Sequence, residues 1–314
     1  MDAPADPAPA APGQSKPRSK ALRGILWMLG ASLCFAGMHG VIKQVAWTGL
    51  HPFEIAFFRV FLGIIPIIPW FLRDGFGPLR TKRLGLFTLR GVRNVGAMMC
   101  FFSALAMAPL AQVTALGFTA PIFATVLAVL FMGEVVRLRR WTAILFGFAG
   151  TVVILRPGFG EIEPGALLVL ISAVIWGGCV IIIKKLGETE SSATITAYMT
   201  VIMAPILAVP AAFVWQWPTL EQWGLLVAIG IFGGGAQMGM AQALKLADTH
   251  VVGPVDFVRL IWVSAIGYAF FNEVPDIFVW IGGAMILGST AYIAYREHRV
   301  GRTKPVVAGP PGMR

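Results

Sequence analysis

The feature that most constrains this chain is a series of apolar runs, each long enough to cross a lipid bilayer. A hydrocarbon core of about 30 Å requires about 20 residues of α-helix. Of the 314 residues, 57% are hydrophobic and only 13% are charged. The sequence therefore predicts an all-α membrane protein with ten transmembrane helices, near residues 24–46, 52–72, 88–108, 110–132, 138–155, 164–186, 192–214, 221–243, 249–271 and 276–295.

Connections rich in basic residues alternate along the chain with connections poor in them, as this topology requires. Lysines and arginines near the ends of spans collect on the cytoplasmic side of a membrane. With the N-terminus inside, most of the 25 basic residues fall on the inner side, whereas the outer connections hold Arg156, with Lys43 near a boundary. We expect a bacterial-type inner (plasma) membrane protein with both termini cytoplasmic. The residues assigned to the inner side are Lys16, Arg18, Lys20, Arg23, Arg73, Arg80, Lys82, Arg83, Arg90, Arg93, Arg137, Arg139, Arg140, Lys184, Lys185, Lys245, Arg296, Arg299, Arg302, Lys304 and Arg314.

The composition of the two chain ends and the spacing of the cysteines allow further expectations. Residues 1–22 are rich in Ala and Pro without an apolar core, so we expect a disordered cytoplasmic tail and no cleaved signal peptide, with a second tail at 298–314. The net charge of +10 lies in short loops and forms no continuous basic surface, which argues against a nucleic-acid partner. Cys34, Cys100 and Cys179 lie in separate apolar runs without metal-ligand spacing, so we expect reduced thiols and no metal.

The two halves of the sequence match each other. The identical pairs include Ala104/Ala243, Leu105/Leu244, Ala108/Ala247, Val113/Val252, Phe118/Phe257, Phe131/Phe270, Glu134/Glu273, Val135/Val274 and Trp141/Trp280 at an offset of 139, and Gly24/Gly165, Leu26/Leu167, Leu29/Leu170, Gly37/Gly178 and Lys43/Lys184 at an offset of 141. Because five spans is an odd number, the second half must enter the membrane inverted. Inverted repeats are typical of alternating-access transporters, which hold substrate near the midplane where the repeats meet. We expect repeat 1 at 23–157 and repeat 2 at 158–297.

The paired blocks resemble a known family. LGFTAPIFATVLAVLFMGEVVRLRRWTAILFGFAGTVVILRPG and VVGPVDFVRLIWVSAIGYAFFNEVPDIFVWIGGAMILGSTAYIAY are similar to the EamA repeat of the drug/metabolite transporter superfamily, over about residues 24–297. LHPFEIAFFR, ALKLADTHVVGP and FFNEVPD resemble the S-adenosylmethionine uptake branch most. The resemblance implies ten helices, a central cavity between the halves and transport of small metabolites. It does not by itself imply one substrate, because one fold serves many functions.

Asp256 and Arg259 lie near the middle of the ninth expected span, where each charge costs about 2.5 to 3.5 kcal/mol. Three residues apart on a helix, they lie about 60° from each other on one face and can pair. Gly253 and Pro254, just before them, are expected to loosen the backbone. A structural pair and a substrate-binding pair both remain open. In the second case, Arg259 holds a carboxylate and Asp256 an ammonium or sulfonium group.

A second pair of charges lies in the second expected span. Glu54 and Arg59 are five residues apart, about 140° around a helix, so each needs another partner. Glu54 is either an interfacial residue one turn from His51 or a proton-coupling residue. Arg59 is deeper, and Asp256 or a substrate is expected to neutralise it.

Aromatic residues occupy equivalent places in the first helix of each repeat. Phe35 and Trp176 are 141 residues apart, each near a helix midpoint, so together they are candidates to sandwich a flat or cationic group. His39 follows one turn after Phe35 and is a candidate to take up a proton. Helix packing or lipid contact remains an alternative for all three.

Two further patterns have structural interpretations. Glu134 and Glu273 end repeat-related helices and are expected to be caps or loop anchors. The run IFGGGAQMGMAQ lacks the GK[ST] ending of a phosphate loop. Its neighbourhood predicts close helix packing through Gly230, Gly234, Gly235 and Gly239.

Three classes of function compete: a secondary transporter, an intramembrane enzyme and a channel. The four histidines form no cluster with other ligands, and the sequence contains no repeated polar filter and no Walker motif. The sequence thus indicates a secondary transporter of a small zwitterionic or cationic metabolite, with no catalytic residues and no cofactor. S-adenosylmethionine uptake is the first expectation and amino-acid or metabolite export the alternative. The expected partners are the bilayer and a proton or counter-substrate, and the expected state is a monomer or homodimer.

Overall fold

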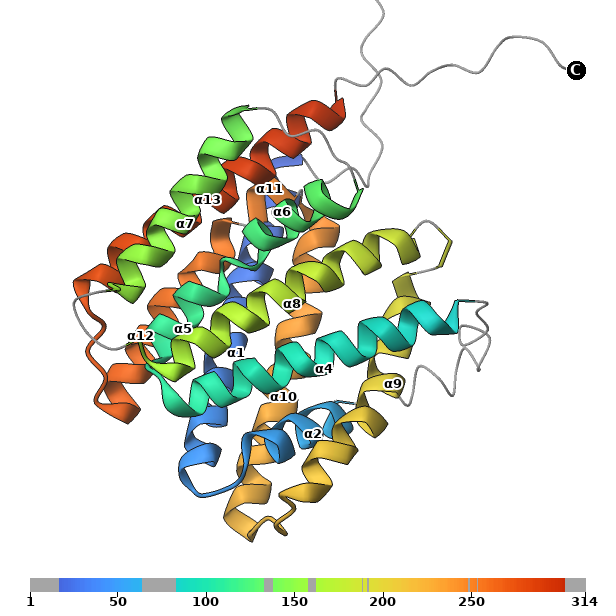
Figure 1. The fold of residues 1–314 in the computed structure, drawn as a ribbon, viewed down its shortest axis with the longest axis vertical. Coiled ribbons are helices and arrows are strands. Elements are labelled where there is room, and N and C mark those ends of the chain that lie inside the picture. The colour runs from blue at the N-terminus through green and yellow to red at the C-terminus, as the bar shows by residue number, and fades with distance from the viewer. Residues whose placement is uncertain are drawn as a thin grey trace, which may run out of the picture.

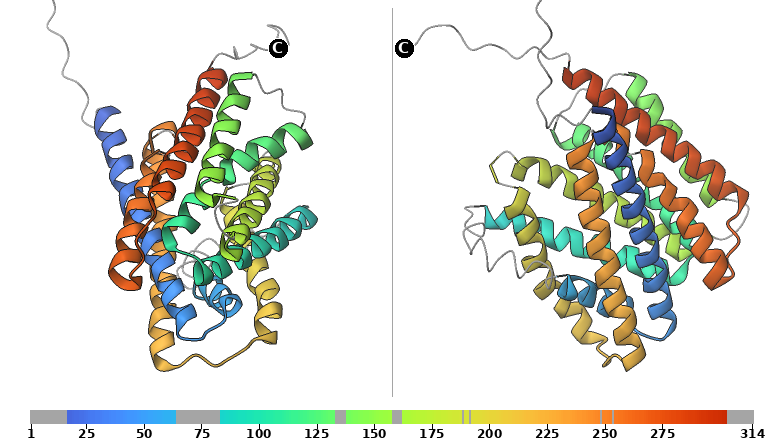
Figure 2. Two further views of the ribbon diagram at one scale, coloured as in Figure 1. Left: turned by 60° about the vertical axis from the view of Figure 1, so that its left-hand side comes forward. Right: turned by 180° about the vertical axis from the view of Figure 1, so that it is seen from behind.

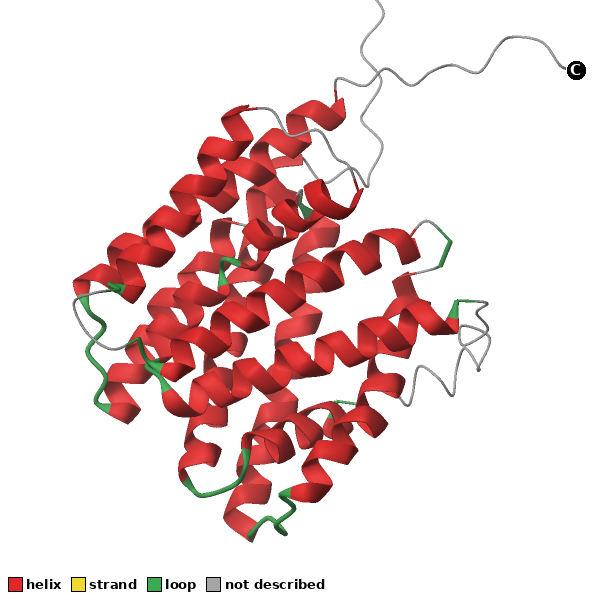
Figure 3. Ribbon diagram, in the orientation of Figure 1, coloured by secondary structure: helices red, strands yellow, loops and turns green. Residues whose placement is uncertain are grey.

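The computed structural model describes residues 17–63, 83–132, 138–157, 162–187, 189–190, 192–247, 249–252 and 254–302. Within these residues the only regular elements are helices (Figure 3), as the sequence predicts for an all-α protein. They are α1 (Pro17–Trp47), α2 (Pro52–Leu62), α4 (Leu84–Met107), α5 (Leu110–Gly117), α6 (Ala120–Met132), α7 (Leu138–Leu155), α8 (Pro164–Gly187), α9 (Ser192–Phe213), α10 (Leu220–Leu246), α11 (Thr249–Val252), the 3₁₀ turn η3 (Pro254–Phe257), α12 (Val258–Phe271) and α13 (Ile277–Arg302).

Successive helices run back and forth along one axis of the bundle (Figure 1). α1 begins and α13 ends at the same end, which we call the inner end because the basic residues predict that it faces the cytoplasm. The turns from α1 to α2, from α9 to α10 and from α12 to α13 lie at the opposite, outer end. This alternation is the one expected for a chain that crosses a membrane repeatedly.

Length and composition make several helices able to span a bilayer. Five qualify by length and apolar character together: Lys20–Trp47, Leu110–Phe131, Pro164–Ile183, Leu220–Leu246 and Pro254–Phe271. Trp141–Leu155, Val201–Phe213 and Ile277–Ile293 are shorter apolar helices. The expected spans and the observed helices agree within a few residues in most cases, but the second half of the span expected at 52–72 lies outside the described residues. The expected tails at 1–22 and 298–314 were drawn too long, because α1 begins at Pro17 and α13 ends at Arg302.

Two of the basic residues assigned to the inner side lie within a helix. Arg90 and Arg93 belong to the first half of α4, which begins at Leu84. Arg90 is buried in the bundle. The guanidinium of Arg93 occupies the space left by the missing side chain of Gly178 on α8, so the long side chain is accommodated within the helix pair.

Helices in repeat-equivalent places are interrupted at matching positions. α5 ends at Gly117 and α6 begins at Ala120, while η3 ends at Phe257 and α12 begins at Val258. Phe118 and Phe257, which are 139 residues apart in the sequence, both lie at these breaks. Their rings meet at 4.5 Å between centroids, so the two breaks face each other inside the bundle. Broken helices near the midplane are where transporters of inverted-repeat architecture place their binding sites.

Small residues let the repeats approach closely. α1 packs along α10 and α8 packs along α4, which are equivalent pairs in the two repeats (Figure 2). On α10, a side chain at Gly239 would collide with Ala31, and one at Gly235 would meet the sulfur of Cys34. Gly230 faces Leu62, whereas Gly234 faces open space. Close packing is therefore confirmed for Gly230, Gly235 and Gly239 and was wrong for Gly234.

The two ends of the bundle should react from opposite sides of the membrane. In a variant whose Cys34, Cys100 and Cys179 are replaced by alanine, Val274→Cys in the α12–α13 connection should react with an impermeant thiol reagent added to intact cells. Thr189→Cys, between α8 and α9, should react only after the cells are permeabilised. Both positions are exposed, so a reversed pattern would reject the assigned orientation.

Candidate functional site

A cavity of about 340 Å³ lies between the two repeats. Its walls come from α1, α2, α4, α5, the start of α6, α8, α10, η3 and the first turn of α12, so neither repeat builds it alone. Ligand pockets of this size hold small organic molecules. Its polar and charged lining residues are His39, Arg59, Asn94, Thr114, Ser172, Gln237, Asp256 and Arg259.

The lining follows the internal repeat of the sequence. Phe35 and Trp176 both line the cavity, and they are 141 residues apart. At the offset of 139, four further lining pairs appear: Met98/Gln237, Phe101/Met240, Gly117/Asp256 and Ala120/Arg259. Repeat 1 therefore places Gly and Ala where repeat 2 places its two charges. The two halves of the lining therefore differ in charge at equivalent positions.

The ion pair expected between Asp256 and Arg259 is present. Arg259 Nη2 lies 2.6 Å from Asp256 Oδ2, and both side chains are mostly buried. The Arg259 guanidinium also lies between two rings, with its Cζ 5.0 Å from the centroid of Phe35 and 4.9 Å from that of Phe118. Such contacts stabilise a cation where water is scarce. Asp256 Oδ1 and Arg259 Nε are nevertheless buried without a hydrogen-bond partner.

Other polar atoms around the cavity are unpaired as well. Arg59 contacts the sulfur of Met98 through Nη1 at 3.6 Å, and its Nε has no partner. Among the described residues no carboxylate lies within ion-pair distance of Arg59, so Asp256 does not neutralise it. His39 Nδ1 is buried and unbonded, with Phe101 against the imidazole ring at 5.2 Å.

Sequence reasoning missed part of this polar lining. Thr114 is 3% exposed, and its hydroxyl is a further buried atom without a partner. Asn94 and Ser172 also line the cavity, and their side chains bond to Met203 and to the carbonyl of Ala97. Isolated Thr, Asn or Ser residues occur in many membrane helices, so only their shared place in the fold distinguishes them. Of the described buried side-chain atoms without partners, Trp262 Nε1 alone belongs to a residue outside the lining.

The aromatic candidates differ in exposure. Trp176 is 41% exposed although it lines the cavity, whereas His39, one turn from Phe35, is 4% exposed. Gln237 is also exposed and lies in the inner half of α10. Among the residues that line the cavity, Trp176 and Gln237 are therefore the exposed ones, and His39 lies in the buried part of the wall.

Two glutamates lie outside the cavity. Glu54 is fully buried and accepts hydrogen bonds from the backbone N–H groups of His51 and Gln216, so it caps α2 and ties α2 to the α9–α10 connection. Glu273 pairs with Lys43, and it thus anchors the α12–α13 connection as expected. Its repeat-related counterpart, Glu134, lies outside the described residues.

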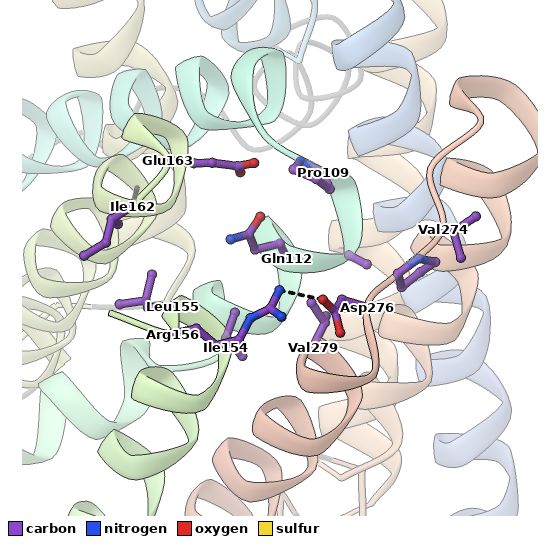
Figure 4. Close-up of a pocket in the computed structure, with 12 residues that line it drawn as sticks. Pro109, Gln112, Ile154, Leu155, Arg156, Ile162, Glu163, Val274, Asp276 and Val279 are labelled. Carbon is purple, nitrogen blue, oxygen red and sulfur yellow. Dashed lines mark hydrogen bonds and ion pairs between the residues drawn. The ribbon is translucent and has the colours of Figure 1, made fainter. Parts of the chain in front are cut away.

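A separate hollow of about 320 Å³ opens at the outer end (Figure 4). Arg156 pairs there with Asp276 at 2.5 Å, and the side chains of Gln112 and Glu163 project into the same space. The backbone N–H of Phe278 donates to Asp276, and together with the Arg156 guanidinium it holds the pKa of Asp276 below its usual value. Because the Arg156–Asp276 pair is well exposed, it contributes little to stability.

Metal ligation finds no support in the geometry of the described part of the chain. No three His, Cys, Asp or Glu side chains gather there as a metal site would require. The cavity is instead suited to bind an organic molecule through paired charges and ring faces.

Comparison with known proteins agrees with this geometry. The EamA-like transporter family model matches residues 22–156 and 163–295, one match for each repeat. The two-repeat architecture expected from the sequence is therefore confirmed. A protein of known crystal structure matches with a TM-score of 0.57 over 90% of this chain and 98% of that chain, and its 20% identity shows the fold alone.

Curated relatives are transporters. The chain is 30% identical over 276 residues to the S-adenosylmethionine uptake transporter of Rickettsia bellii (strain RML369-C), covering 88% of this chain and 94% of the relative. It is 32% identical over 291 residues to the riboflavin transporter of Vibrio cholerae, covering 91% and 98%. It is 28% identical over 271 residues to the pseudopaline exporter of Pseudomonas aeruginosa, covering 84% and 93%.

These relatives support a multi-pass bacterial membrane protein that transports a small molecule and is not an enzyme. The family match covers both repeats and nearly the whole helical bundle. The chain belongs to the EamA-like transporter family of the drug/metabolite transporter superfamily.

Proposed function

We propose that this protein is a secondary transporter that carries a small metabolite with a carboxylate, a positive group and a flat ring across the inner membrane. S-adenosylmethionine is the first candidate. The observation that carries the proposal is the set of buried, unpaired polar atoms on His39, Arg59, Thr114, Asp256 and Arg259 around one cavity. Buried polar groups normally have partners, so a site where several lack them fits a place filled by water or substrate.

The charges suggest how a zwitterion binds. Arg59 has no carboxylate partner among the described residues, and a substrate carboxylate fits that need. Asp256 has one free oxygen, which can accept a substrate ammonium or face a sulfonium group. Arg259 pairs with the other oxygen of Asp256, so the site offers both a cationic and an anionic group within a mostly apolar wall.

The rings suggest how a flat group binds. Phe35, Phe101, Phe102 and Trp176 line the cavity beside the charged residues. A purine ring or other planar group gains about 1 to 3 kcal/mol by stacking on an aromatic face. Trp176 is the most accessible of these rings and is our candidate for the stacking partner.

Riboflavin is a second candidate, favoured by a specific observation. The Asp256–Arg259 pair already neutralises itself, and the remaining wall is rich in rings that suit an uncharged tricyclic ring system. The V. cholerae relative carries that name. The pseudopaline exporter shows that relatives also include an exporter, so export remains the alternative direction.

Alternating access explains how one cavity serves both sides of the membrane, because equivalent helices of the inverted repeats exchange roles. We propose that both termini are cytoplasmic and that the protein acts as a monomer or homodimer. Coupling to a proton or a counter-substrate would act through Asp256 or His39, which line the cavity. Glu54 is a weaker candidate because it is used as a helix cap.

Reconstitution tests the substrate. Purified protein in proteoliposomes should take up labelled S-adenosylmethionine, and unlabelled S-adenosylmethionine inside the vesicles should accelerate uptake by exchange. Riboflavin is measured in parallel, in both directions, with and without a pH gradient. Saturable transport of riboflavin alone would select the second candidate, and transport of neither would reject both.

Arg259→Ala should abolish transport while the protein remains folded, because the cavity offers space for water beside the remaining Asp256 carboxylate. A purely structural pair gives another result, since a stranded buried charge costs about 3 to 5 kcal/mol and lowers the melting temperature. Thermal melting and transport are measured together. In the exchanged variant Asp256→Arg with Arg259→Asp, full recovery of transport would contradict a binding role.

Trp176→Ala should weaken substrate affinity by about 1 to 3 kcal/mol, because it removes a stacking surface. Trp217→Ala is the matched control, since Trp217 is 79% exposed in the α9–α10 connection and outside the cavity. Titration calorimetry on both variants measures the difference. Equal affinities for Trp176→Ala and the parent protein would return Trp176 to a packing role.

A further inference from the structure

A second ionic centre closes the outer end of the bundle. Lys43 near the end of α1 pairs with Glu273 of the α12–α13 connection, so the pair joins repeat 1 to repeat 2. The Lys43 ammonium also donates to the carbonyl of Ala108 at 2.8 Å, and Glu273 Oε2 accepts from the backbone N–H of Leu110 at 2.8 Å. Two side chains thereby fasten three segments, with the α4–α5 corner held by both.

The pair is enclosed by apolar groups. The side chains of Lys43 and Glu273 are 4% and 16% exposed. The rings of Trp47 and Phe271 each lie 5.6 Å from the Lys43 ammonium and contact each other edge to face at 5.0 Å. A side chain added at Gly267 would meet Glu273 Oε2 at 2.9 Å, so the glycine makes room for the carboxylate. The charges and rings together form a plug.

This plug separates the cavity from the outer hollow. Lys43 is one helical turn beyond the lining residue His39, and Leu110 is one turn beyond the lining residue Thr114, a rise of about 6 Å in each case. On the other side, Pro109 and Val274, which adjoin the bonded residues, line the outer hollow in Figure 4. The plug therefore lies between residues that line the two spaces.

The sequence repeats the same residues in the other half. At an offset of 141 Lys43 meets Lys184, and at an offset of 139 Glu273 meets Glu134, as Ala108 meets Ala247. Polar identities within apolar spans seldom arise by chance. The residue types of the pair thus recur in the inverted copy, as expected if a corresponding pair serves each end in turn.

We propose that Lys43 and Glu273 form a latch that closes the outer end of the transport path and opens when the cavity turns outward. This rests on the proposed transport function but on no particular substrate. Each charged group of the latch has one backbone partner in addition to the other charge: the Lys43 ammonium donates to the Ala108 carbonyl, and the Glu273 carboxylate accepts from the Leu110 N–H. When the latch breaks, its two charged groups exchange their protein partners for water that enters from outside, so opening and hydration occur together.

Accessibility of the cavity tests the latch without any substrate. Thr114→Cys is made in the background that lacks the native cysteines, and it reports on the cavity wall. Right-side-out vesicles are treated with an impermeant thiol reagent, which reaches the protein from the outer side only. Lys43→Met combined with Glu273→Gln removes both charges, so neither residue is left as an unpaired buried charge. We expect outside labelling of Thr114→Cys to become about tenfold faster, because the closed state loses its ionic bonds. The control is Arg156→Gln with Asp276→Asn, which removes an exposed ion pair at the same end and should leave the rate unchanged.

Unchanged labelling in a normally folded latch variant would overturn the proposal, as would equal acceleration in the control. If the double variant does not fold, Glu273→Gln alone is used, because its amide oxygen can still accept from Leu110 N–H. The exchanged variant Lys43→Glu with Glu273→Lys should label as fast as the neutral one. In that variant a carboxylate faces the Ala108 carbonyl, so two acceptors meet, and an ammonium faces the Leu110 N–H, so two donors meet. A slow, parent-like rate in that variant would reject the role of the backbone bonds. Failure of the substrate assignment leaves these rates untouched.

Discussion

A charge inside a bilayer is costly unless protein groups, water or a ligand solvate it. Pairing reduces this cost for four ionic residues of the bundle, whereas Arg59 has no ion-pair partner among the described residues. Asp256 and Arg259 meet in the cavity between aromatic rings, and Lys43 and Glu273 meet one turn beyond it at the outer end. Both pairs are placed where segments of the two repeats come together. The pairing that makes burial tolerable therefore also concentrates charge along the transport path.

The repeats are equivalent in backbone but not in chemistry. Gly117 and Ala120 occupy the places in repeat 1 that Asp256 and Arg259 occupy in repeat 2. Four charges buried in one cavity of about 340 Å³ would each carry a desolvation cost. Replacing one pair by small residues leaves space for a ligand and gives the site a direction. The break between α5 and α6 at Phe118 also helps to form the site, because it brings helix ends close to the midplane.

The ion pair of the latch and the ion pair of the cavity differ in their hydrogen-bond partners. The cavity pair retains unbonded atoms on Asp256 and Arg259, as a site awaiting a ligand should. The latch pair is instead bonded to backbone groups of Ala108 and Leu110, as a closure should be. The same residue types thus serve binding in one place and closure in another, and their hydrogen-bond partners distinguish the two.

The sequence by itself determined the helical class, the spans and the repeat, because hydrophobic length and charge asymmetry act locally along the chain. It also determined that Asp256 and Arg259 pair, since a spacing of three fixes their relative direction. Only the tertiary structure decided that Glu54 caps a helix, that Thr114 lines the cavity, and that Arg93 fills the gap at Gly178. These outcomes depend on which distant helix faces each side chain, and hydrophobic pattern carries no information about that when nearly every face is apolar.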